Sequence, residues 1–279
     1  MKFTSASLFL SGFYATLVLL WFTVSSLGLI ASPHLDTFLT GVKDAPYSYF
    51  FAFAYGLIPI IGGVLGFNSA QKWGLFKSSM GIALFFLSMG LITWGYGELI
   101  WSYYNFFLNQ EIPYPSWADA SFILSWPLWS IGVLYLGKAT GIKFGLRNKG
   151  GQLLLILVPL FAMLVSYYLL VVVARGGSLQ LEGGMLKIFF DLAYPLLDVV
   201  ILTLAVIVYG LSFKYLGGQF KWPVLITLFG FVVNYMADFA FSYTTTVGTF
   251  SNGNWVDLLF ATSVFILSFG ITSFELKES

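Results

Sequence analysis

The sequence predicts an all-α, polytopic integral membrane protein with eight transmembrane helices and both termini in the cytoplasm. Two observations predict the class: 58% of the 279 residues are hydrophobic and only 9% are charged, whereas soluble domains contain about a quarter charged residues. A third observation, the separation of basic residues between alternate connections, predicts the orientation. An ordinary soluble domain is therefore excluded.

Long apolar stretches recur along the chain, and a helix needs roughly 20 such residues to cross the hydrocarbon. They lie at about 7–31, 48–67, 78–107, 117–137, 152–174, 185–213, 222–244 and 255–274. The stretches are continuously apolar, whereas the strands of membrane barrels alternate, so helices are expected. Because the connections are short, we predict a single transmembrane domain, 1–279, built from helical hairpins at about 7–67, 78–137, 152–213 and 222–274.

Basic residues are concentrated at the two ends of the chain and in alternate connections. This set comprises Lys2, Lys72, Lys77, Lys138, Lys143, Arg147, Lys149, Lys214, Lys221 and Lys277. The other connections hold only Lys43, Arg175 and Lys187. Connections rich in Lys and Arg stay in the cytoplasm. The expected location is therefore the cell inner membrane, with the N and C termini inside.

Composition excludes several classes of chemistry. The chain has no cysteine and a single histidine, His34, in a predicted loop, so no disulfide, metal site or cofactor is expected. A histidine base for a serine nucleophile is lacking within the spans, and Lys187, at a helix mouth, is the only lysine there. Glycines such as Gly62 are expected to permit close helix contact. With a net charge of +1, no nucleic acid is expected as a partner. A non-enzymatic protein is predicted.

Short polar motifs recur in two pairs of neighbouring helices. Each copy has an acid, a Ser-Tyr pair and, after a loop, the pattern Trp-x-Asp-x-x-Phe-x-x-Ser. The first copy consists of Glu98, Ser102, Tyr103, Trp117, Asp119, Phe122 and Ser125. The second repeats every spacing within each helix at Asp238, Ser242, Tyr243, Trp255, Asp257, Phe260 and Ser263. The sequence therefore predicts an internal repeat of hairpins.

Three runs within these helices suggest a known kind of protein. They are Tyr114-Pro115-Ser116-Trp117-Ala118-Asp119, Ala193-Tyr194-Pro195-Leu196-Leu197-Asp198 and Asn254-Trp255-Val256-Asp257. Over roughly residues 80–275 the chain resembles the eight-helix membrane sensory modules that precede diguanylate cyclase or histidine kinase domains in bacterial signalling proteins. The resemblance implies a role as sensory input. No output domain follows by Ser279, so a separate signalling output protein is the partner that we expect.

Several carboxylates fall inside predicted spans. At ~1.5 Å per residue, Glu98 lies ~30 Å and Asp238 ~24 Å along their helices, at similar depths near the outer face. On the sixth helix, Asp191, Tyr194, Pro195 and Asp198 share one face. A carboxylate in hydrocarbon costs several kcal/mol unless it is paired, protonated or hydrated. These side chains are therefore expected to face the bundle interior or a water-filled vestibule.

Two interpretations of these carboxylates remain open. The functional one is an outward-facing acidic and aromatic pocket that binds an organic cation through ion pairing and cation–π attraction, or a simple ion or proton. Its candidate residues are Glu98, Asp191, Asp198, Asp238, Tyr96, Trp101, Tyr103, Tyr167 and Tyr243. The structural one makes Asp119 and Asp257 helix caps and gives Glu98 and Asp238 hydrogen bonds between hairpins.

The functional hypothesis is a sensory or ligand-binding module, or a structural subunit of a larger membrane complex. Its expected partners are membrane lipid, another membrane protein and the separate output protein; anionic lipid or an acidic partner would meet the basic segment 138–149. The alternative is a cation- or proton-coupled small-molecule transporter. Against it, the inner half below Asp198 and Asn234 has no ionisable residue to continue a relay.

Overall fold

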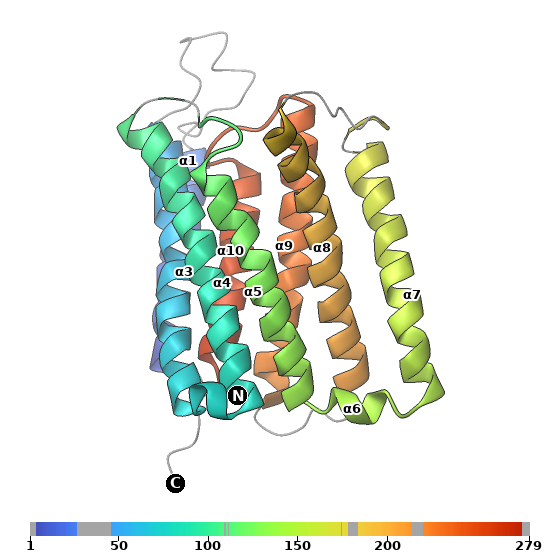
Figure 1. The fold of residues 1–279 in the computed structure, drawn as a ribbon. Helices are drawn as coiled ribbons and strands as arrows, with labels where there is room; N and C mark the ends of the chain where they lie inside the picture. The colour runs from blue at the N-terminus through green and yellow to red at the C-terminus, as the bar shows by residue number, and fades with distance from the viewer. Residues whose placement is uncertain are drawn as a thin grey trace.

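All regular structure in the described part of the chain is helical, as predicted (Figure 1). The computed structural model describes residues 4–26, 46–108, 110, 112–173, 175–177, 184–213 and 220–274, without the side chains of Pro46 and Asp191. Outside these ranges lie His34 and four of the basic residues used above, Lys2, Lys43, Lys214 and Lys277.

Eight of the described helices are long and apolar enough to cross a membrane, which confirms the predicted spans. They are α1 (Ser5–Ser26), α3 (Pro46–Lys72), α4 (Ser79–Ser102), α5 (Trp117–Ala139), α7 (Lys149–Ser166), α8 (Met185–Ser212), α9 (Lys221–Thr246) and α10 (Trp255–Thr272). Two of them continue into π-helical turns, α4 into η2 (Tyr103–Phe107) and α7 into η3 (Tyr167–Val173). The short helices η1 (Leu75–Lys77) and α6 (Ile142–Gly145) connect their neighbours at one end of the bundle.

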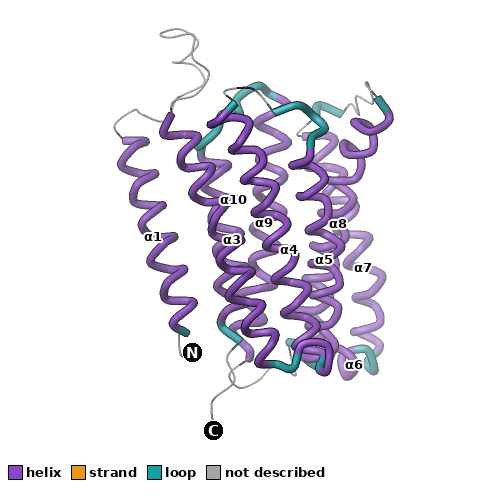
Figure 2. Tube along the Cα trace, turned by 60° about the vertical axis from the view of Figure 1, so that its left-hand side comes forward, coloured by secondary structure: helices purple, strands orange, loops and turns teal. Residues whose placement is uncertain are grey.

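The helices form one upright bundle with α1 and α7 on opposite flanks (Figures 1 and 2). Between the flanks, α3, α4 and α5 pack in sequence, and α10 packs against α9 and α3. The remaining long helix, α8, contacts α5, α9 and α7. Few side chains of α1 and α7 are buried inside the bundle, so these two helices offer the largest faces to lipid. The internal repeat remains a prediction.

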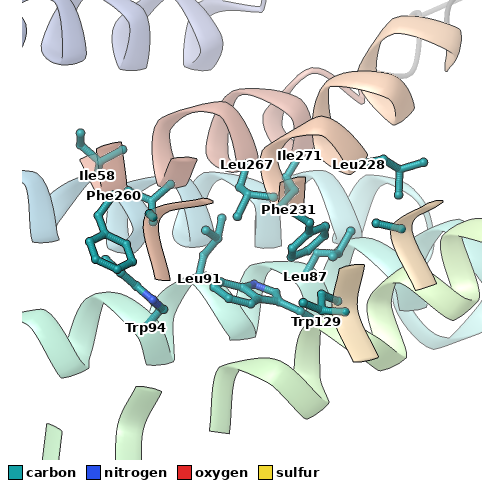
Figure 3. Close-up of a cluster of buried hydrophobic side chains, with 14 of the residues drawn as sticks. Ile58, Leu87, Leu91, Trp94, Trp129, Leu228, Phe231, Phe260, Leu267 and Ile271 are labelled. Carbon is teal, nitrogen blue, oxygen red and sulfur yellow. The ribbon is translucent and has the colours of Figure 1, made fainter. Parts of the chain in front are cut away.

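The core is a set of buried apolar and aromatic side chains, most of them from α3, α4, α5, α9 and α10 (Figure 3), with smaller contributions from α1 and α8. Glycine residues, which have no side chain, let the central helices approach closely. A Cβ added at Gly62 in α3 would lie 2.1 Å from Ser268 Oγ in α10, and one at Gly90 in α4 would lie 2.3 Å from the Trp129 ring in α5. Glycine at these positions therefore sets the spacing of the central helices.

The first and last helices meet at the end of the bundle that contains α6. Thr4 Oγ1 donates to the Thr272 carbonyl at 3.2 Å, and the Trp73 indole donates to the Phe274 carbonyl at 3.1 Å. The basic side chains described at this end are Lys72, Lys77, Lys138, Lys143, Arg147, Lys149 and Lys221. No acidic residue of the described part lies there. Charge is thus asymmetric along the bundle axis.

Candidate functional site: an acidic cavity

A cavity of about 450 Å³ lies in the half of the bundle away from α6, within the range of small-molecule sites. Helices α3, α4, α5, α8, α9 and α10 surround it, and the α4–α5 and α9–α10 connections form its rim. Its carboxyl-bearing residues are Glu98, Asp119, Asp198, Asp238 and Asp257. Its aromatic residues are Tyr55, Trp94, Trp101, Tyr114, Phe122, Trp126, Tyr194, Phe241, Phe250 and Phe260. We refer to it as the acidic cavity.

Four residues proposed from the sequence as ligand-binding lie together in this lining: Glu98, Asp198, Asp238 and Trp101. They come from three different helices, α4, α8 and α9. The other carboxylate proposed for the pocket, Asp191, belongs to α8, but its side chain lies outside the described part of the chain. Acidic residues that are far apart in the sequence therefore meet at one site inside the bundle.

Four tyrosines expected in the pocket lie elsewhere. Tyr103, Tyr167 and Tyr243 are 52%, 61% and 41% exposed on the outside of the bundle, and Tyr96 is also exposed. The reason is helical phase, because five residues rotate a side chain by about 500°, or 140° past a full turn. Tyr243 follows Asp238 by five positions, whereas Ser242, at four positions, does line the cavity. Tyr167 opens the π-helical turn η3, which also departs from the 3.6-residue period.

Two acids at the buried end of the cavity are hydrogen-bonded to each other, Asp198 of α8 and Asp238 of α9. Asp198 Oδ1 also accepts from the Trp126 indole at 3.1 Å, and Asp238 Oδ2 accepts from Asn234 Nδ2 at 2.8 Å. Two ionised carboxylates side by side would repel each other, so we expect the pair to share one proton. A pair that shares a proton presents one negative charge.

Glu98 lies across the cavity and is only 7% exposed. The hydroxyl of Tyr55 in α3 donates a hydrogen bond to its carboxylate, and Asp257 is close enough to interact electrostatically with it. Gly56 makes room for this side chain, because a Cβ at that position would lie 2.8 Å from Glu98 Cβ. Helix α3 thus makes room for the Glu98 side chain and supplies a hydrogen-bond donor to its carboxylate.

Asp119 and Asp257 hold the starts of α5 and α10 and also line the cavity. Asp119 Oδ2 accepts from Ser116 N at 2.7 Å within a capping box, and its Oδ1 accepts from the Tyr194 hydroxyl at 3.0 Å. Asp257 Oδ2 accepts from Gly253 N at 2.5 Å. These two acids therefore have the structural contacts expected of caps, while facing the same space as the other three.

Sequence reasoning did not assign Tyr55, Trp94 or Trp126 to the pocket. Tyr55 comes from α3, and no sequence motif signals that α3 packs beside Glu98. For Trp126 a weak signal existed, because Trp126-Pro127 in α5 parallels Tyr194-Pro195 in α8. Both rings line the cavity and stand 5.7 Å apart between centroids.

The cavity ends on aromatic side chains toward the α6 end. Trp94 and Phe260 lie in its lining with their ring centroids 5.7 Å apart. Below them Trp129 and Phe231 form a second edge-to-face pair, at 5.5 Å, among buried leucines of α4 and α10 (Figure 3). These packed layers separate the cavity from the opposite end.

No protein family, curated protein or solved structure matches the chain significantly. Within the described residues, no cluster of three or more His, Cys, Asp or Glu side chains is suited to hold a metal ion. The chemistry of the cavity is therefore what indicates its ligand. One guanidinium, that of the partly buried Arg175, accompanies its five carboxyl groups among the described lining residues.

Proposed function

We propose that the protein is a non-enzymatic membrane module that binds an organic cation in the acidic cavity. The observation behind this proposal is the combination of five carboxyl-bearing residues with ten aromatic residues around one space. Aromatic faces attract cations by about 0.5–2 kcal/mol each, most strongly where water is excluded. Carboxylates add ion pairing, so an ammonium group with an apolar body is the ligand that fits both.

The proposed orientation places the α6 end in the cytoplasm and the cavity toward the outside of the cell inner membrane. The concentration of Lys and Arg at the α6 end supports it, since basic connections remain cytoplasmic. The same basic end is then available to anionic lipid, to another membrane protein or to a signalling output protein. A ligand from outside would therefore be recognised on one face, and a partner met on the other.

We favour sensing or binding over transport because of the aromatic layers below the cavity. A transporter needs a polar or openable route to the other side, and helices discontinuous near the midplane usually supply it. Trp94, Trp129 and Phe231 instead fill the centre of the bundle and are buried. The resemblance to bacterial sensory modules agrees with a binding role that is read out by a partner.

The test is calorimetry on the full chain in phosphatidylcholine nanodiscs, with phenethylammonium as the probe and phenethyl alcohol as its neutral counterpart. We expect the amine to bind and the alcohol not to. Glu98→Gln, and separately the double substitution Asp198→Asn with Asp238→Asn, should weaken binding about tenfold or more, equivalent to about 1.4 kcal/mol.

Tyr243→Phe is the matched control, because its ring lies outside the cavity, and it should bind like the wild type. Equal binding of amine and alcohol, or no binding of phenethylammonium and tetraethylammonium by the wild type, would refute the proposal.

A further inference from the structure

A second hollow, of about 480 Å³, lies on the flank between α8 and the α7–η3 segment. Its residues include Met163, Leu170, Leu196 and Val200, and its surface is almost entirely apolar. We refer to it as the flank groove. Pro159 of α7 and Pro195 of α8 both line it. Because proline has no backbone N–H, each helix lacks one backbone hydrogen bond at this position.

The flank groove opens sideways from the bundle. Met163 and Leu196 on its two walls are 52% and 64% exposed, and the flank helix α7 has a largely exposed surface. Pro195 lies ~15 Å along α8 from its start at Met185. This depth corresponds to the interior of a membrane whose hydrocarbon is about 30 Å thick. The natural occupant of such an opening is a hydrocarbon chain.

The groove and the acidic cavity are neighbours that share part of their walls. Leu170 and Pro195 line both of them. On α8 the next residues diverge, because Asp198 faces the cavity while Val199 faces the groove. The apolar groove on the flank thus lies within one helical turn of Asp198.

We infer that the ligand is an amphiphilic cation, a long-chain amine. Its ammonium group lies in the acidic cavity, and its hydrocarbon chain leaves through the flank groove into the bilayer. This inference rests on the proposed function and specifies its ligand class. Charge complementarity selects the head, since carboxylates surround one end of the path. The apolar walls accept the tail, because a hydrocarbon chain that lies against them leaves no polar group unpaired.

The experiment is photoaffinity labelling of the full chain in phosphatidylcholine nanodiscs. The probe is a long-chain primary amine with a diazirine at the end of its chain, and the comparison probe is the alcohol of the same length. Mass spectrometry then maps the labelled residues. We expect the amine to label the groove walls around Met163, Leu196 and Val200, and an excess of unlabelled amine to suppress this labelling.

A groove-filling variant sharpens the test. Val200→Trp should lower the competed labelling about tenfold while phenethylammonium binding stays as in the wild type. Leu19→Trp, on the exposed side of α1, is the matched control and should change neither. The short amine also shows that the variant is folded.

The outcomes separate the two proposals. If phenethylammonium binds but the long-chain probe labels all lipid-facing helices evenly, the amphiphile is refuted and the cation site stands. Equal labelling of the groove by the alcohol would show ordinary lipid there and would also refute the amphiphile. If no amine of either length binds, the proposed function itself fails.

Discussion

The indole of Trp126 donates to Asp198 Oδ1 at 3.1 Å, and this bond joins α5 to α8 beside the acidic cavity. A second buried tryptophan in α5, Trp129, has no hydrogen-bond partner for its own Nε1. The two rings are 5.9 Å apart and both fully buried. The pair therefore allows the hydrogen bond to be measured separately from the loss of a large ring.

Trp126→Phe should destabilise the protein by about 1–3 kcal/mol more than Trp129→Phe. Both substitutions remove a similar volume, but only the first leaves a buried carboxyl oxygen without its donor. The measurement is the midpoint of thermal or dodecyl sulfate unfolding in the same detergent. Equal destabilisation by the two variants would show that the hydrogen bond contributes nothing.

Single substitutions in the acid pair should affect cation binding little. Asp198→Asn leaves one negative charge on Asp238, which is the charge that the proton-sharing pair already presents, and its amide can still donate to Asp238. Phenethylammonium affinity should change by less than about threefold, or about 0.6 kcal/mol. Calorimetry on Asp198→Asn, Asp238→Asn and the double variant checks this. A single variant as weak as the double would contradict a shared proton.

Gly56→Ala should disturb Glu98, because the new Cβ would lie 2.8 Å from the Glu98 Cβ. Overpacking of this kind costs about 1–3 kcal/mol, and the displaced carboxylate should bind phenethylammonium more weakly. Gly12→Ala is the control, since nothing lies within 4 Å of a Cβ at that position in α1. Unfolding midpoints and calorimetry report the two effects. If the two alanine variants behave alike, the close approach of α3 and α4 at Glu98 does not determine the stability of the protein or its binding of phenethylammonium.

The proposed orientation is open to a direct test, because the chain contains no cysteine. Val247→Cys, at the exposed end of α9 near the cavity, should react with a membrane-impermeant maleimide added to intact cells. Asn148→Cys, exposed at the α6 end, should react only after permeabilisation. The reverse pattern would invert the topology and place the cavity toward the cytoplasm.

Helix positions were predictable from the sequence because each span is a continuous apolar run of the length that a bilayer demands. The predicted stretch 222–244, for example, corresponds to α9 at Lys221–Thr246. The inward location of Glu98, Asp198 and Asp238 was also predictable, since an unpaired charge in hydrocarbon is costly.

The aromatic lining was not predictable to the same degree. A tyrosine is stable facing lipid or facing a cavity, so composition does not choose its side, and one residue of displacement rotates it by about 100°. Tyr243 and Ser242 illustrate this, being adjacent in sequence and on different faces. Contacts between distant helices, such as that of Tyr55 with Glu98, have no local signal at all.

Helix α10 touches both ends of the molecule. Near its start, Asp257 and Phe260 border the acidic cavity. Just beyond its far end, the Phe274 carbonyl is held by Trp73, while Thr272 accepts from Thr4. Because a helix has a fixed rise per residue, an axial shift at Asp257 would be carried to the hydrogen-bonded end, some 25 Å away at ~1.5 Å per residue.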